Sequence, residues 1–331
     1  MNEILIFVMF FIGLIIIIKG GDLFVEAAIW IAIITGIPTI LIGATLVSFA
    51  TTLPEFFVST IAATKGYTEM AIGNAIGSTI CNMGFILGIC SLISPVTIRR
   101  RFFTIKGLLM IGALISFYYF SRDYVVDEFD GYVLLLILIL YIIINITEFK
   151  TNVEAKDSVE KWNGLSFAKN ICKFIFGCGL IILGARLLVD NGVEIANIFN
   201  VPEQVISLTL IALGTSLPEL ITSITAIIKG HMGISVGNII GANILNITMV
   251  LGGSSLLSQN GLLISTRDLS IADRILVQVP QTLVFDIPVS LLMMVIIVLC
   301  GTYKRMIDRF HGALLLSLYL CYLSILVYIS F

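Results

Sequence analysis

Long apolar runs are the feature that most constrains the fold of this 331-residue chain. A helix needs about 20 apolar residues to cross the hydrocarbon core of a bilayer, and short polar or Gly/Pro breaks divide the sequence into runs of roughly that length. Hydrophobic residues make up 58% of the chain and charged residues 12%, so too few polar side chains remain to cover a water-soluble surface. The sequence therefore predicts an all-α polytopic membrane protein.

We expect ten transmembrane helices. Their predicted ranges are 3–30, 38–63, 70–94, 103–120, 131–147, 169–197, 202–228, 233–257, 281–301 and 311–330. The hydrophilic segment 148–168 separates five helices in 1–147 from five in 169–331. One set of alternate loops carries thirteen Lys and Arg residues and the other set carries four. Because cytoplasmic loops carry the excess of basic residues, we expect 148–168 to be a cytoplasmic linker and both termini to be extracellular.

A repeated motif relates the two halves of the chain. The stretch ATTLPEFFVST starts at Ala50 and GTSLPELITSI starts at Gly214, so the copies are 164 positions apart. The same offset matches further residues over roughly fifty positions, including Gly77 with Gly241. Five helices per half is an odd number, so the second copy must enter the membrane from the opposite side. The sequence therefore predicts two inverted five-helix repeats, which are typical of secondary transporters, with a site near the midplane.

Each copy of the motif places a proline inside an apolar helix. Pro54 and Pro218 lack the N–H group that would bond the carbonyl four residues earlier, so the carbonyls of Ala50 and Gly214 lose their helical partners. Backbone carbonyls without partners are tolerated at membrane depth only where they line a cavity or meet a ligand. These two prolines therefore indicate helix breaks at a binding site.

A glutamate follows each proline. Glu55 and Glu219 lie near the middle of their spans, and no Lys or Arg lies within a helical turn of either one. An unpaired carboxylate in a membrane interior is costly, so we expect a proton or a metal cation to accompany it. The hydroxyls just before the prolines are further oxygen donors: Thr51, Thr52, Thr215 and Ser216.

The third and eighth predicted helices carry the matched stretches GNAIGSTICNMG (73–84) and GNIIGANILNIT (237–248). Their glycines are four residues apart and favour close helix packing. Asn82 lies five residues after Gly77, and Asn246 lies five residues after Gly241. In the first copy only, Ser78 lies between the glycine and the asparagine. An amide oxygen is a good cation ligand, although both amides could instead make interhelical hydrogen bonds.

Together these groups form an all-oxygen set with two carboxylates. Hard cations prefer such sites, and Ca²⁺ takes six to eight oxygens in a flexible geometry. Two glutamates would balance its charge, whereas Mg²⁺ prefers to keep its waters. The residue chemistry therefore favours Ca²⁺.

These motifs resemble the alpha-repeats of the calcium/cation antiporter superfamily, specifically its sodium/calcium exchanger branch of prokaryotic type. The resemblance implies that Glu55 and Glu219 hold Ca²⁺ and that helices one and six slide across the core to open the site to each side in turn. It also implies that backbone carbonyls around Ser48 and Ala212 add ligands. The side chains that it implies for adjoining Na⁺ and Ca²⁺ sites are Thr51, Thr52, Ser78, Asn82, Thr215, Ser216 and Asn246.

Two residues depart from the family pattern. Ala242 stands where its repeat mate is Ser78, so the second half lacks one hydroxyl. Asn246 stands where many prokaryotic members and the potassium-dependent branch carry Asp, so this site has two carboxylates rather than three. This difference argues against K⁺ transport and leaves the number of Na⁺ ions open.

We therefore expect a secondary antiporter that exchanges Ca²⁺ for Na⁺, needs no cofactor and works as a monomer in a prokaryotic cell membrane. H⁺/Ca²⁺ antiport is the main alternative, because protons also neutralise two glutamates, and a passive cation channel is a weaker one. Neither a nucleophile–base pair nor a phosphate-binding glycine loop indicates an enzyme. The net charge of −2 and scattered basic residues give no reason to expect nucleic-acid binding.

Charged residues outside the motifs suggest structural roles. Asp286 precedes Pro288, a pattern typical of a helix N-cap followed by an early proline. Two groups of charges have the spacing of surface pairs within one helix. They are Lys19, Asp22 and Glu26 in the first helix and Arg186, Asp190 and Glu194 in the sixth.

Overall fold

The computed structural model describes residues 3–34, 47–98, 100–152, 164–228, 232–271 and 274–330. The described part of the first half forms α1 (Glu3–Ile34), α3 (Val47–Thr51), α4 (Leu53–Thr64), α5 (Thr68–Cys81), the π-helical turn η2 (Asn82–Ile86), α6 (Leu87–Ile93), α7 (Arg100–Phe120), the 3₁₀ turn η3 (Ser121–Asp123) and α8 (Glu128–Asn152).

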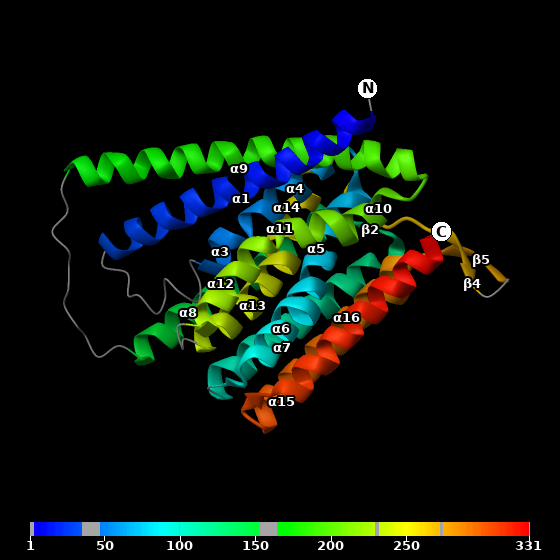
Figure 1. Cartoon of the computed structure of the whole chain (residues 1–331). Helices are drawn as coiled ribbons and strands as arrows, with labels where there is room; N and C mark the ends of the chain where they lie inside the picture. Colours follow the sequence, from blue (N-terminus) through cyan, green and yellow to red (C-terminus); the bar gives the residue numbers. More distant parts are fainter. Residues whose placement is uncertain are drawn as a thin grey trace.

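The described part of the second half forms an equivalent series of helices. They are α9 (Gly164–Phe199), α10 (Glu203–Ile206), the π turn η4 (Ser207–Ile211), α11 (Ala212–Thr215), α12 (Leu217–Ile228), α13 (Met232–Leu245), the π turn η5 (Asn246–Val250), α14 (Leu251–Leu257), the π turn η6 (Thr282–Asp286), α15 (Ile287–Tyr303) and α16 (Arg309–Ser330). The first turn of α1 and the last turn of α16 lie at the same end of this helix bundle (Figure 1).

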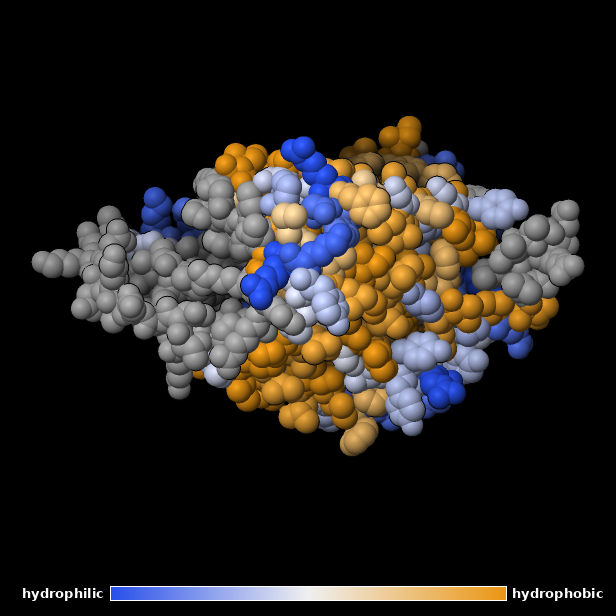
Figure 2. All heavy atoms as spheres, turned by 90° about the horizontal axis from the view of Figure 1, so that it is seen from below, coloured by the Kyte–Doolittle hydropathy of each residue, from blue (hydrophilic) through white to orange (hydrophobic). Residues whose placement is uncertain are grey.

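Nine helices among the described residues are long and apolar enough to cross a membrane, and α4 is a shorter apolar helix. The predicted second span begins in residues that lie outside the described ones and continues through α3 and α4. The all-helical polytopic prediction is therefore confirmed. Large apolar side chains on the outside of the bundle, such as Leu136 and Ile143 of α8, are exposed, as expected for lipid-facing positions. Figure 2 shows one face on which hydrophobic residues cover most of the described surface.

Helices of one half pack on helices of the other half in pairs that the repeat relates to each other. Helix α6 packs on α16, and α14 packs on α8; α1 packs on α9, and α7 packs on α15. Short strands follow the same rule, because β1 (Val96–Thr97) pairs with β6 (Met306–Ile307), and β2 (Val125–Val126) pairs with β3 (Leu262–Leu263). Each contact thus has a counterpart in which the halves change places, as an inverted repeat requires.

Reciprocal glycines bring α1 and α9 close together. A Cβ atom at Gly13 would lie 3.1 Å from the Gly184 carbonyl oxygen, and one at Gly20 would lie 2.9 Å from the Gly177 carbonyl oxygen. Gly13 and Gly177 are 164 positions apart, as are Gly20 and Gly184. The repeat offset therefore extends to the first helix of each half, and its glycines allow backbone-to-backbone packing.

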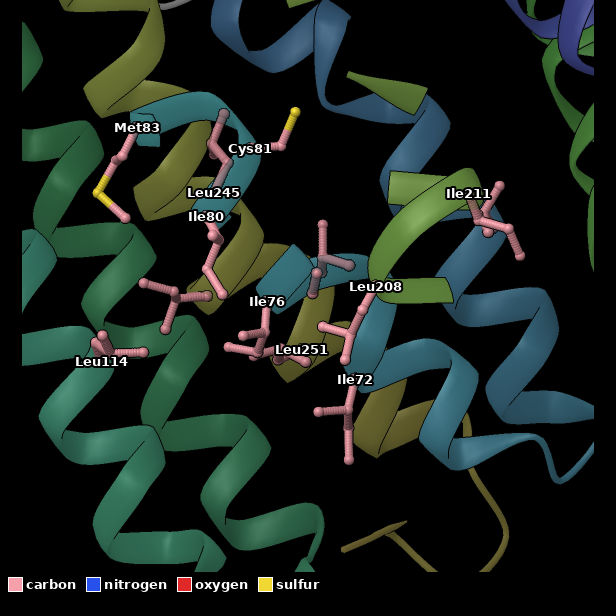
Figure 3. Packing of buried hydrophobic residues seen from close by; sticks show 14 of the residues in the cluster. Ile72, Ile76, Ile80, Cys81, Met83, Leu114, Leu208, Ile211, Leu245 and Leu251 are labelled. Carbon is pink, nitrogen blue, oxygen red and sulfur yellow. The ribbon is translucent and has the colours of Figure 1, made fainter. Parts of the chain in front are cut away.

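The centre of the bundle is built around α5. Ile72, Ile76 and Ile80, spaced one helical turn apart, are buried in the hydrophobic core together with residues such as Leu208 and Leu251 from the second half (Figure 3). Side chains of both halves therefore form one continuous core.

The structure differs from the sequence predictions at the central linker and between α14 and η6. Helix α8 continues to Asn152 and α9 begins at Gly164, so both ends of the expected linker 148–168 are helical. A hairpin of β4 (Arg267–Ile271) and β5 (Arg274–Val279) lies between α14 and η6, where we expected only a loop. It projects from the bundle in Figure 1.

Asp286 directly precedes α15 and Pro288 is the second residue of that helix, as expected, but Asp286 does not cap it. Helical structure already begins at Gln281, and Asp286 makes no capping hydrogen bond. Its buried carboxylate instead accepts hydrogen bonds from Gln204 Nε2 (3.1 Å), Gln281 Nε2 (3.2 Å) and Tyr322 OH (3.0 Å). Asp286 therefore joins three helical segments. The spacing to Pro288 was misleading because the π turn η6 extends the helix backwards by a full turn.

The expected pairing of surface charges within single helices is also wrong for two carboxylates. Glu26 of α1 pairs with Lys173 of α9, with 2.5 Å between Oε1 and Nζ, and Asp190 of α9 pairs with Lys65 after α4. Both pairs connect different helices, because α1 and α9 pack along their length and α4 contacts α9.

Candidate cation site

Both predicted helix breaks are present in the structure. Helix α3 ends one residue before Thr52 and α4 begins one residue after it; Ser216 separates α11 from α12 in the same way. Pro54 and Pro218 are each the second residue of the helix that follows the break. The prolines thus interrupt the helices where the candidate ligands lie.

Glu55 and Glu219 are completely buried, and each lies beside hydroxyls of the other half. Ser216 Oγ donates a hydrogen bond to Glu55 Oε1 (3.3 Å), and Thr215 lies close to the same carboxylate. Thr51 and Thr52 lie beside the Glu219 carboxylate. The two glutamates are also close enough to repel each other electrostatically. Both halves therefore contribute to one site.

Most carboxylate oxygens in this site have no hydrogen-bond donor among the residues that the structure describes. The Thr51 and Thr52 hydroxyls are turned to the Ser48 carbonyl oxygen (3.3 and 2.7 Å), so neither oxygen of Glu219 meets hydrogen-bond geometry with a described residue. Glu55 Oε2 is in the same situation. Buried carboxylate oxygens without donors are unfavourable, and a bound cation would satisfy them.

Ser78 connects the two halves. Its hydroxyl lies 3.4 Å from the Thr215 hydroxyl and donates to the Ala212 carbonyl oxygen at 3.4 Å. Gly77 makes this approach possible, because a Cβ atom there would lie 2.8 Å from Ala212 Cβ. In the other half, Gly241 is equally restricted, since a Cβ atom there would lie 2.6 Å from Ser48 Oγ. The two glycine motifs thus make equivalent close contacts.

Asn82 and Asn246 occupy matching positions in the backbone. Each is the first residue of a five-residue π turn, η2 and η5, and each is buried. Turn η2 packs on α12, which carries Glu219, and η5 packs on α4, which carries Glu55. Single π turns inside α-helices are frequent at functional sites. The oxygen atoms of both amides are buried without a hydrogen-bond donor among the described residues.

The sequence reasoning missed two further asparagines. Asn74 Nδ2 donates to the Glu55 carbonyl oxygen (3.2 Å), and Asn74 Oδ1 accepts a hydrogen bond from the Thr215 hydroxyl (3.2 Å). Asn238, at the matching position, donates from Nδ2 to the Thr222 hydroxyl (3.2 Å). Both follow the first glycine of their GNxIG motif and are 164 positions apart, so the repeat offset could have identified them.

The oxygen atoms in this site are the kind of ligands that hard cations prefer. Within the described ranges, no cluster of three or more His, Cys, Asp or Glu side chains could hold a metal ion. The site offers two carboxylates together with neutral hydroxyl and amide oxygens. This set fits Ca²⁺ and Na⁺ better than a soft transition metal.

Comparison with protein families is decisive. The family described as sodium/calcium exchanger protein matches residues 5–147 and 169–328 of this chain. The chain belongs to this family. The exchanger is therefore a membrane transporter and not an enzyme, and the resemblance inferred from the LPE and GNxIG motifs is confirmed.

Individual proteins support this assignment. The exchanger is 28% identical to the sodium/calcium exchanger MaX1 of Methanosarcina acetivorans, over 98% of this chain and 99% of that one. It is 36% identical to the inner membrane protein YrbG of Escherichia coli, over 75% of this chain and 78% of that one. A solved structure of the sodium-calcium exchanger NCX_Mj, soaked with Na⁺ and Sr²⁺, shares its fold with a TM-score of 0.66 and 30% identity, over 97% of this chain and 99% of that one.

Proposed function

We propose that the protein exchanges Ca²⁺ for Na⁺ by alternating access, with both ions competing for a site built on Glu55 and Glu219. The observation that carries this proposal is the burial of two neighbouring carboxylates, three of whose four oxygens have no donor among the described residues. Thr51, Thr52, Ser78, Asn82, Thr215, Ser216 and Asn246 supply further oxygens.

Charge neutralisation explains why the exchange is coupled. Leaving a buried carboxylate charged and unpaired costs at least a few kcal/mol, and two neighbouring carboxylates cost more because they repel each other. One Ca²⁺ or several Na⁺ ions remove this cost, whereas an empty site keeps it. The empty carrier therefore does not reorient, and Ca²⁺ leaves only when Na⁺ replaces it.

The reciprocal geometry of the site suits alternating access. Glu55 lies beside hydroxyls of the second half and Glu219 beside hydroxyls of the first half. Movement of one set of helices against the other would change which side of the membrane reaches these groups. In the proposed arrangement, units 1–147 and 169–331 are inverted repeats, the linker 148–168 is cytoplasmic, both termini are extracellular and the monomer is functional.

The experiment that tests the site is Na⁺-driven uptake of radiolabelled Ca²⁺ into proteoliposomes containing Glu55→Gln or Glu219→Gln. Both variants should fall to the level of empty liposomes, because glutamine keeps the size of the side chain and removes its charge. Glu128→Gln, at an exposed position at the start of α8, is the matched control and should transport at the wild-type rate. Normal uptake by both site variants would refute the assignment.

A further inference from the structure

A hydrogen bond between two amides connects the two halves beside the candidate site. Asn82 Nδ2 donates to Asn243 Oδ1 at 3.1 Å, and neither side chain is exposed. Asn82 begins η2, whereas Asn243 lies in the last turn of α13, three residues before Asn246. The contact therefore joins one candidate ligand to a residue that has no assigned role.

In this hydrogen bond the Asn82 amide directs its NH₂ group towards Asn243. A planar amide whose NH₂ group donates in one direction must direct its oxygen in the other. Asn82 Oδ1 is buried and has no donor among the described residues. In this orientation, the oxygen is available to a cation while the NH₂ group, which would repel one, is held away.

Among the described residues, the Asn246 amide in the other half has no matching hydrogen bond. The repeat mate of Asn243 is Thr79, and the Thr79 hydroxyl donates to the Ala75 carbonyl of its own helix at 2.9 Å. Both amide atoms of Asn246 are buried without a hydrogen-bond partner within the described part of the chain. The two candidate amide ligands are therefore held differently, although their backbones match.

We propose that Asn243 is a positioning residue that holds the Asn82 amide so that its oxygen faces the transported cation. The proposal rests on the proposed function of the site. It divides the two amides by role: a hydrogen bond holds the Asn82 amide, whereas the Asn246 amide has no hydrogen-bond partner among the described residues. An acceptor at position 243 is the property that matters, because the Asn82 NH₂ group needs it.

The test measures KM and maximal rate for Ca²⁺ uptake in proteoliposomes containing Asn243→Leu or Asn243→Gln. Leucine has a similar size and no acceptor, so KM should rise about tenfold while the maximal rate changes less than about twofold. Glutamine keeps a neutral amide oxygen as acceptor and adds no charge to the site, so it should keep KM within about threefold of the wild-type value. If the leucine variant does not fold, Asn243→Ala makes the same comparison. Thr79→Val is the matched control and should leave KM unchanged.

A double-mutant cycle separates positioning from a general structural effect. Asn82→Leu should raise KM by itself, and adding Asn243→Leu to it should raise KM no further, because the amide to be positioned is gone. Additive effects, or a rise in KM with Asn243→Gln as large as with Asn243→Leu, would overturn the proposal. Failure of the proposed function appears separately, as uptake that persists in Glu55→Gln and Glu219→Gln.

Discussion

Asn246 determines how many negative charges the proposed site carries. Asn246→Asp would place a third carboxylate in a buried site that already holds Glu55 and Glu219. Three neighbouring carboxylates repel one another, so one of them should take up a proton readily, and a protonated aspartate resembles asparagine. We expect the variant to transport Ca²⁺ like the wild type at about pH 6 and to lose activity as the pH rises towards about 8, where that proton is released.

The measurement is the ratio of variant to wild-type uptake across this pH range, with Asn246→Gln as the uncharged control. The ratio should fall with rising pH for the aspartate variant alone. A ratio that does not depend on pH would show that position 246 lies outside the charged part of the site.

Residues of the candidate site could be predicted where both halves of the repeat carry a matching residue. Glu55, Glu219 and the hydroxyls beside them have mates 164 positions away, and the structure brings them together. Asn74 and Asn238 are also matching residues 164 positions apart. Asn243 could not be found in this way, because its mate is threonine and its contact with Asn82 depends on how α13 packs against η2.

At the scale of elements, close packing of α5 on η4 and α11 requires glycine. Gly77→Val would place a Cβ atom 2.8 Å from Ala212 Cβ and 2.9 Å from Leu208 Cα, so the helices must move apart. Overpacking of this kind costs about 1–3 kcal/mol. We expect the apparent melting temperature of the purified protein to fall by several degrees.

The control for this prediction is Gly112→Val in α7, where a new Cβ atom meets nothing within 4 Å. It should melt within about a degree of the wild type, because a valine there adds no buried contact. Equal melting temperatures for both variants would show that α5 tolerates a larger residue and that the contact is not tight.

The length of apolar runs predicts where helices cross a membrane, because the bilayer has a fixed thickness. Helix α5 begins at Thr68 and α15 ends at Tyr303, each two residues from its predicted limit. The π turns could not be predicted, since the choice between bonding partners four and five residues away depends on tertiary packing. The predicted range 281–301 already covers η6, although the spacing of Asp286 and Pro288 suggested a helix start within it.

At the scale of the whole molecule, the exchanged contacts between the halves follow from the inverted repeat. Strand β1 pairs with β6 and β2 with β3, while α6 packs on α16 and α14 on α8. An odd number of helices per repeat requires the second half to enter the membrane from the opposite side, so the inverted repeat could be inferred from counting apolar runs. Departures from the symmetry, such as the hydrogen bond between Asn82 and Asn243, could only be found in the structure.

The most direct test of the account is an ion-flux measurement on the wild-type protein. Proteoliposomes loaded with Na⁺ are diluted into Na⁺-free medium containing radiolabelled Ca²⁺, and parallel samples receive a pH step or no gradient. The account predicts Ca²⁺ accumulation that requires the outward Na⁺ gradient, saturates with Ca²⁺ and disappears when an ionophore dissipates that gradient. Uptake that follows the pH step in the absence of Na⁺, or that proceeds without any counter-cation, would contradict Na⁺/Ca²⁺ exchange.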